Sequence, residues 1–199
     1  MKILIIDNVE PHDVAFNEPL QKCIAELAEV ESINYREVPA ASELDAQYDA
    51  IVISGAPLIY ANDVIDSRLP FLDWISQVTI PVLGICLGHQ NMARLFGGDM
   101  IVDKEAENGA IALSIVQDDP LLAGIKTGDA VTEMHRVSVT LPGGWMQLAS
   151  TKACPNQIMK HGTKPLYGVQ FHPELSPVGH SILANFVKMS SLASATPRG

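Results

Sequence analysis

The chain has 199 residues, of which 47% are hydrophobic, and a formal net charge of −10 at pH 7. This length suffices for one domain with a substantial core. The acidic balance argues against a nucleic-acid partner, because such a surface needs Lys and Arg to neutralise phosphates. No apolar run is long enough to span a membrane, and the first residues show no signal-peptide pattern. The three cysteines have neither disulfide nor metal spacing, so we expect a reducing, cytoplasmic setting.

Strands and helices are predicted to alternate in the first half of the chain. Apolar, β-prone runs predict strands at 2–7, 32–38, 49–54 and 81–85. Apolar residues at three- and four-residue steps predict helices at 14–29, 69–75 and 87–96. This alternation predicts an α/β fold with a central, mostly parallel sheet and helices on both faces.

The character of the chain changes after Gly97-Gly98. Short β-prone runs separated by Gly and Pro turn signals occur at 111–117, 130–134, 136–141, 145–150 and 157–160. We interpret them as an antiparallel region added to the parallel sheet. A closing helix is predicted at 176–189, followed by a disordered tail at 190–199. No linker interrupts residues 1–189, which we expect to form a single domain.

Cys86 lies at the junction of a predicted strand and a predicted helix, with Gly84 and Gly88 two residues away on either side. This pattern is typical of a nucleophile elbow, in which glycines let two backbone segments approach around a strained turn. The start of a helix also favours a thiolate. A buried core cysteine is an equally good interpretation of this stretch taken alone.

A second motif, His172-Pro173-Glu174, follows the β-prone run at 167–171. Residues two apart in an extended segment project to the same side, so the carboxylate could orient the imidazole. A thiol nucleophile needs such an oriented base. Strand ends on one edge of an α/β sheet gather into sites. The two motifs together therefore predict a Cys86-His172-Glu174 triad.

Three further features have both a functional and an ordinary interpretation. The loop around Gly55 and Ala56 is an ordinary turn, or it supplies an oxyanion N–H together with that of Leu87. Gln90 contacts a substrate or caps the elbow. His135 lies near the site or is an exposed strand residue. Phosphate-binding and metal-binding motifs are absent, so we expect no cofactor and no metal.

The stretches 84–90 (GICLGHQ) and 171–174 (FHPE) resemble the signature pair of class I glutamine amidotransferase domains, and the resemblance extends from about Lys2 to Met189. It implies the flavodoxin-like class I amidotransferase fold. It also implies that Cys86 is the nucleophile, His172 the base and Glu174 its partner. The loop Gly55-Ala56-Pro57, Leu87 and Gln90 would surround L-glutamine. Stretches 108–115, 147–161 and 164–174 are most similar to the glutaminase part of GMP synthetases.

The resemblance implies that a separate, ATP-dependent synthetase chain uses the ammonia, because no synthetase domain follows. Two departures from the family pattern bear on this. Ala56 replaces the second glycine of the loop, and Met134-His135-Arg136-Val137 replaces a Ser-His-x-Asp segment that is expected to face the partner. The alternatives are a stand-alone γ-glutamyl peptidase or hydrolase, an amidotransferase for another acceptor, and a regulatory module with a dead site. The intact triad argues against the last.

Overall fold

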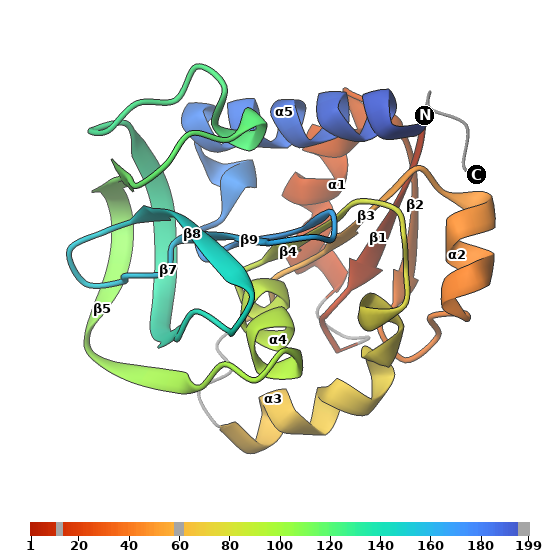
Figure 1. Cartoon of the computed structure of the whole chain (residues 1–199), viewed down its shortest axis with the longest axis horizontal. Helices are drawn as coiled ribbons and strands as arrows, with labels where there is room; N and C mark the ends of the chain where they lie inside the picture. Colours follow the sequence, from red (N-terminus) through yellow and green to blue (C-terminus); the bar gives the residue numbers. More distant parts are fainter. Residues whose placement is uncertain (11–13, 58–61, 195–199) are drawn as a thin grey trace.

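A computed structural model describes residues 1–10, 14–57 and 62–194, and its centre is an eight-stranded sheet in the order β2-β1-β3-β4-β10-β9-β8-β6 (Figure 1). The first five strands in this order are parallel. They are β1 (Lys2–Asp7), β2 (Glu29–Asn34), β3 (Ala50–Ile53), β4 (Val82–Ile85) and β10 (Leu166–Val169).

Helices cover both faces of this sheet because the buried strands carry apolar side chains on both sides. In β1, Ile3 and Ile5 join one core cluster and Leu4 and Ile6 join the other. α1 (Glu18–Ala25) and α5 (Pro177–Ser194) cover the first face. α2 (Ala41–Gln47) and α4 (Leu87–Leu95) cover the second, and α3 (Asn62–Arg68) lies beside α4 (Figure 1). None of the helices in the described ranges is long and apolar enough to cross a membrane.

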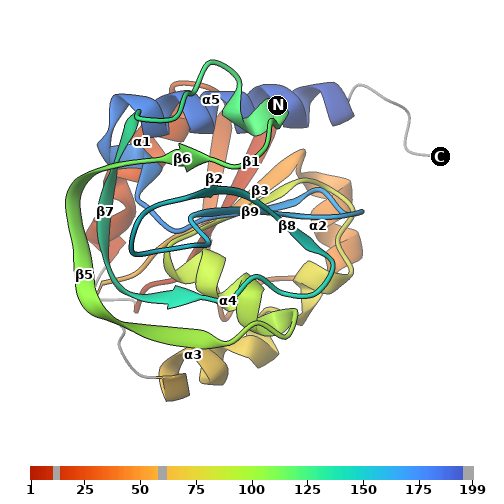
Figure 2. The same cartoon turned by 60° about the vertical axis from the view of Figure 1, so that its left-hand side comes forward.

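The remaining strands form the antiparallel region. β9 (Ile158–His161), β8 (Trp145–Ser150) and β6 (Ser114–Ile115) continue the main sheet beyond β10. β5 (Met100–Ala112) and β7 (Ala130–Val139) pair as a separate two-stranded sheet, which we call the β5–β7 arm. Figure 2 shows this arm flanking the main sheet. Short 3-10 turns complete the fold at Val14–Asn17, Leu69–Phe71, Asp73–Ser76, Pro120–Leu122 and Pro173–Leu175.

The predicted α/β fold and antiparallel region are confirmed, and four local predictions are wrong. The helix predicted at 14–29 ends at Ala25, and the next strand begins at Glu29 instead of residue 32. The helix predicted at 69–75 is two 3-10 turns, since Pro70 interrupts regular helix. The strands predicted at 130–134 and 136–141 are one continuous strand.

The tail prediction is also wrong where the structure describes it. α5 continues to Ser194, and Ser190 is fully buried, with its hydroxyl donating to the carbonyl of Phe186 at 2.9 Å. Small polar residues can stay helical when one face packs against the sheet. Residues 195–199 lie outside the described ranges.

Candidate active site

Cys86 stands at the turn between β4 and α4 with φ 49° and ψ −104°, and among the described residues it is the only one besides glycine with a positive φ. Such a conformation costs about 1–3 kcal/mol. Glycines make the turn possible: a Cβ on Gly84 would lie 2.7 Å from the backbone of Gly88, and one on Gly88 would lie 2.5 Å from the carbonyl oxygen of Ile53. The tight strand-to-helix turn predicted at Cys86 is therefore present.

His172 reaches Cys86 because β10 is the parallel neighbour of β4. Val169 pairs with Ile85, and the N–H of Cys86 donates to the carbonyl of Val169 at 2.8 Å. The two chain segments that follow these strands therefore leave the same sheet edge side by side. Both the imidazole of His172 and the thiol of Cys86 are buried.

Glu174 lies beside His172 with its Oε1 2.7 Å from Nδ1. The expected extended geometry is wrong beyond His172: Pro173–Leu175 is a 3-10 turn, which brings the carboxylate back to the imidazole. Pro173 suits the first position of this turn, where no N–H is needed. His180 on α5 is 3.0 Å from the carbonyl oxygen of Glu174 through its Nε2 and so fastens the turn to the helix.

The environment of His172 favours its protonated form. Burial lowers the pKa of this imidazole, but hydrogen bonds and charge interactions with Cys86 and Glu174 outweigh burial and raise the pKa to about 10. An imidazolium placed between a cysteine and a carboxylate stabilises the thiolate form of that cysteine. The ring of Phe16 packs edge-on against the imidazole with centroids 5.8 Å apart, which adds an apolar wall.

Gly55 forms the facing side of the site. A Cβ at this position would lie 2.9 Å from Cε1 of His172 and 3.3 Å from Cβ of Cys86, so only a glycine fits without displacement. Ala56 follows with its methyl group in a small apolar cluster with Val9, Ile65 and Leu87. Leu87 opens α4, where backbone N–H groups have no acceptor within the helix. The backbone of the loop at Gly55 and the backbone at the start of α4 thus both lie next to Cys86.

A buried hydroxyl fixes the loop. Ser54 Oγ accepts hydrogen bonds from the backbone N–H of Asn8 and from Nδ2 of Asn17, each at 2.9 Å. Its own proton is therefore left for the carbonyl of Gly55, also at 2.9 Å. The hydroxyl has used all its hydrogen-bonding capacity. The orientation of the Gly55 carbonyl is thus set by contacts to the segment after β1.

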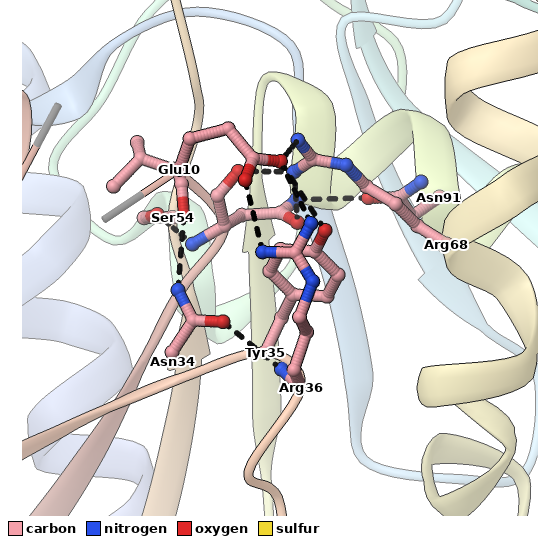
Figure 3. A network of polar contacts seen from close by, with 9 residues as sticks. Glu10, Asn34, Tyr35, Arg36, Ser54, Arg68 and Asn91 are labelled. Atoms are coloured by element: carbon pink, nitrogen blue, oxygen red, sulfur yellow. Dashed lines mark hydrogen bonds and ion pairs between the residues drawn. The ribbon is translucent and has the colours of Figure 1, made fainter. Parts of the chain in front are cut away.

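The same segment carries a polar network, drawn in Figure 3. Arg68 is nearly fully buried, donates to the backbone carbonyl and side-chain oxygen of Asn8, and lies over the ring of Tyr35 with its guanidinium carbon 4.5 Å from the centroid. Asn8 in turn donates to Asn91 of α4 at 2.8 Å. Glu10 neutralises Arg68 at 3.4 Å and the exposed Arg36 at 2.9 Å. The network ties α3 and α4 to the loops at the site.

The side chain of Gln90 extends from α4 toward the β5–β7 arm. Its Nε2 donates to the carbonyl of Val137 at 2.8 Å and to Oε1 of Gln170 at 3.2 Å. Gln170 was not predicted as a site residue, yet its Nε2 lies 3.8 Å from the sulfur of Cys86. The spacing of Gln170 could have revealed it, because Gln170 and His172 are two residues apart at the end of one strand and residues at this spacing point to the same side.

His135 does not face outward, so the expectation that its side chain is partner-facing is wrong. Its side chain is 3% exposed, and its Nε2 lies 3.2 Å from Glu107 Oε2 and 3.1 Å from Glu133 Oε2. Along β7 the odd positions point inward, because that face is covered by the main sheet. The exposed residues of this segment are Met134 and Arg136.

Known proteins resemble this chain over almost its whole length. The family model described as glutamine amidotransferase class-I matches residues 5–189. A glutamine-hydrolysing GMP synthase component from Methanosarcina mazei is 31% identical over 96% of this chain and 98% of its own. The corresponding component from Pyrococcus abyssi is 37% identical over 70% of this chain and 74% of its own.

A solved structure agrees with these sequence matches. A protein of Thermoplasma acidophilum described as a GMP synthase component superimposes with a TM-score of 0.84 and 28% identity, over 98% of this chain and 96% of its own. The elbow, the neighbouring histidine and the glycine loop lie within the matched region. The chain therefore belongs to the class I glutamine amidotransferase family.

Proposed function

We propose that this glutamine amidotransferase hydrolyses the side-chain amide of L-glutamine at Cys86 and supplies the ammonia to a separate synthetase chain, which aminates XMP to GMP. One observation supports glutamine hydrolysis at Cys86. Glu174 lies 2.7 Å from His172, and this pair follows a strand that neighbours the strained turn of Cys86. The names of the relatives support the use of the ammonia for GMP synthesis.

The first step is attack of the Cys86 thiolate on the amide carbon. His172 gives its proton to the departing ammonia, while Glu174 holds the imidazole in place. The N–H of Leu87 and an N–H of the loop at Gly55 or Ala56 stabilise the negative oxygen. Loss of one such donor costs about a hundredfold or more in rate.

The second step releases glutamate. The first leaves a γ-glutamyl thioester on Cys86 and a neutral imidazole on His172. The imidazole removes a proton from a water molecule, the hydroxide attacks the thioester carbonyl, and the Cys86 thiolate leaves beside the imidazolium, which restores the starting state. Amide nitrogen and glutamate depart separately, so the ammonia can pass to another active site. Burial of Cys86 and His172 shields the thioester from uncontrolled hydrolysis.

The decisive experiment compares glutamate release by the chain alone and with its cognate synthetase chain, XMP and ATP. We expect weak basal hydrolysis and strong stimulation, because such sites often close only on a partner. Arg136→Glu, which changes an exposed residue of β7, should reduce stimulation and leave basal hydrolysis unchanged. No stimulation by an active synthetase contradicts the XMP assignment. Faster turnover of γ-glutamyl peptides than of glutamine would instead identify a peptidase.

A further inference from the structure

A second cluster of ionisable side chains is buried between the β5–β7 arm and the main sheet, apart from the triad. Glu107 comes from β5, His135 and Glu133 from β7, and Cys154 from the turn between β8 and β9. One ligand atom each from Glu107, His135 and Cys154 lie within 4.8 Å of one another, and all three residues are buried. These elements meet only in the folded chain, so no short sequence motif marks the cluster.

The cluster contains more negative than positive charge. Glu107 Oε2 and Glu133 Oε2 lie 3.2 and 3.1 Å from the same nitrogen, Nε2 of His135. A single N–H cannot satisfy two carboxylates. Glu133 is the carboxylate that lacks hydrogen-bond donors. Its side chain has no solvent-accessible surface, and within the described part of the chain neither of its oxygens accepts a well-directed hydrogen bond. A buried carboxylate in this state is stabilised either by a further cation or by a proton, and burial raises the pKa of Glu133.

Glu107, in contrast, is held rigidly. Its Oε1 accepts a hydrogen bond from Thr151 at 2.6 Å, and its Oε2 accepts one from Gln157 at 2.9 Å. Bonds of this kind orient carboxylates that bind metals. The separations of 3.1 and 3.2 Å between oxygen and nitrogen also suit a coordination tetrahedron, because two ligands about 2.0–2.1 Å from Zn²⁺ lie about 3.3 Å apart.

We propose that Glu107, Glu133, His135 and Cys154 form a binding site for a divalent transition metal of the zinc type. Carboxylate, imidazole and thiolate are the ligands that Zn²⁺ takes in proteins. The bound ion would supply the positive charge that Glu133 lacks. It would also join the β5–β7 arm to the β8–β9 turn of the main sheet.

The site would influence catalysis through the position of His172. The arm contacts the catalytic segment directly: the carbonyl of Thr132 accepts the N–H of His172 at 3.0 Å, and the hydroxyl of Thr132 donates to the carbonyl of Leu175 at 3.1 Å. A metal that holds β7 would therefore hold the backbone of His172. In this proposal the ion has a structural role and takes no part in glutamine hydrolysis.

Cobalt(II) titration tests the site, because a cobalt–thiolate bond gives an intense near-ultraviolet absorption. The experiment uses the Cys86→Ala chain without an affinity tag, so that the catalytic thiol cannot contribute. We expect about one cobalt per chain with a thiolate band, and about one zinc per chain by mass spectrometry after growth with zinc. Cys154→Ser should abolish the band, whereas the matched control Cys23→Ser should keep it.

Glu133→Gln provides a second test that does not depend on the thiol. With a metal ligand lost, zinc affinity should fall about tenfold or more and zinc should no longer raise the melting temperature. In metal-free protein the same change should leave the melting temperature equal or higher, because a buried charge is removed. Absence of bound metal and of the cobalt band, or a band that survives Cys154→Ser, would overturn the proposal.

Discussion

The hydroxyl of Ser54 donates to the carbonyl of Gly55 at 2.9 Å, and this contact fixes a peptide that faces Cys86 and His172. Ser54→Ala removes the donor and leaves the buried N–H of Asn8 without its acceptor. We expect a loss of about 1–3 kcal/mol in unfolding free energy and a fall in kcat with a smaller change in KM.

The matched control for Ser54 is Ser190→Ala, which also removes a fully buried hydroxyl bonded to a carbonyl, but on α5 away from the site. Urea unfolding and glutaminase kinetics should show a stability loss in both variants and a kcat loss only in Ser54→Ala. Equal kcat in the two variants would mean that Ser54 serves stability alone.

Gly55→Ala tests the close approach of the loop to the triad. The new methyl would lie 2.9 Å from Cε1 of His172, so either the loop or the imidazole must move. We expect kcat to fall by about a hundredfold or more, the size of a lost oxyanion donor, with a cooperative unfolding transition retained. Gly143→Ala is the control, because its added Cβ has no heavy atom within 4 Å.

Cys86 should be a strained residue that the fold tolerates for function. Because a φ of 49° suits glycine, the unfolding free energy of Cys86→Gly should exceed that of Cys86→Ala by about 1 kcal/mol. Denaturant unfolding of the two variants measures this difference. Both variants should lack glutaminase activity. Wild-type turnover in Cys86→Ala would refute the nucleophile assignment, and equal stability of the two variants would refute the strain.

The pKa of His172 can be measured by NMR with labelled histidine. Its Cε1 resonance should not titrate between pH 6 and 9 if the pKa is raised to about 10. Cys86→Ala and Glu174→Gln should each lower this pKa, because each removes a group that favours the imidazolium. A titration of the wild-type resonance near pH 6.5 would contradict the ion-pair description.

The same shift predicts how stability depends on pH. The imidazolium is favoured in the folded chain, so its contribution is complete below the usual pKa of 6.5 and is lost as the pH rises through about 10. Over this range the folded chain holds a proton that the unfolded chain has released, and stability falls by at most about 1.4 kcal/mol per pH unit. The difference in unfolding free energy between wild type and His172→Asn should narrow as the pH rises. Parallel curves of unfolding free energy against pH would exclude a stabilising contribution from the His172 imidazolium.

Arg68 should contribute more to stability than Arg36, although both pair with Glu10. Arg68 is buried and donates to the carbonyl of Asn8, whereas the side chain of Arg36 is 42% exposed. Arg68→Met should cost about 1–3 kcal/mol because it leaves buried oxygens without a donor. Arg36→Met should change the unfolding free energy by about 0.5 kcal/mol or less. Similar losses in denaturant unfolding would show that the ion pair, and not burial, matters.

The residues of the site and the turn at Cys86 could be predicted from the sequence, whereas the 3-10 turn at Pro173–Leu175 could not. Gly84 and Gly88 around Cys86 predict the elbow because only glycine permits the backbone approach, and His172-Pro173-Glu174 keeps base and carboxylate within three residues. The alternation of apolar runs predicts the parallel sheet that places these two motifs on one edge. Such features depend on neighbours along the chain, which a sequence pattern records.

The inward orientation of several polar side chains depends on tertiary contacts and could not be predicted from the sequence. His135 was expected near the site or exposed on a strand, but its imidazole lies in the interior of the continuous strand β7, where it meets Glu107 from 28 residues earlier in the chain. Ser54 was likewise expected in an ordinary turn, and its hydrogen bonds to Asn8 and Asn17 come from the segment that follows β1. The burial and hydrogen bonding of a polar group depend on what covers it, and residues distant in the chain supply that cover.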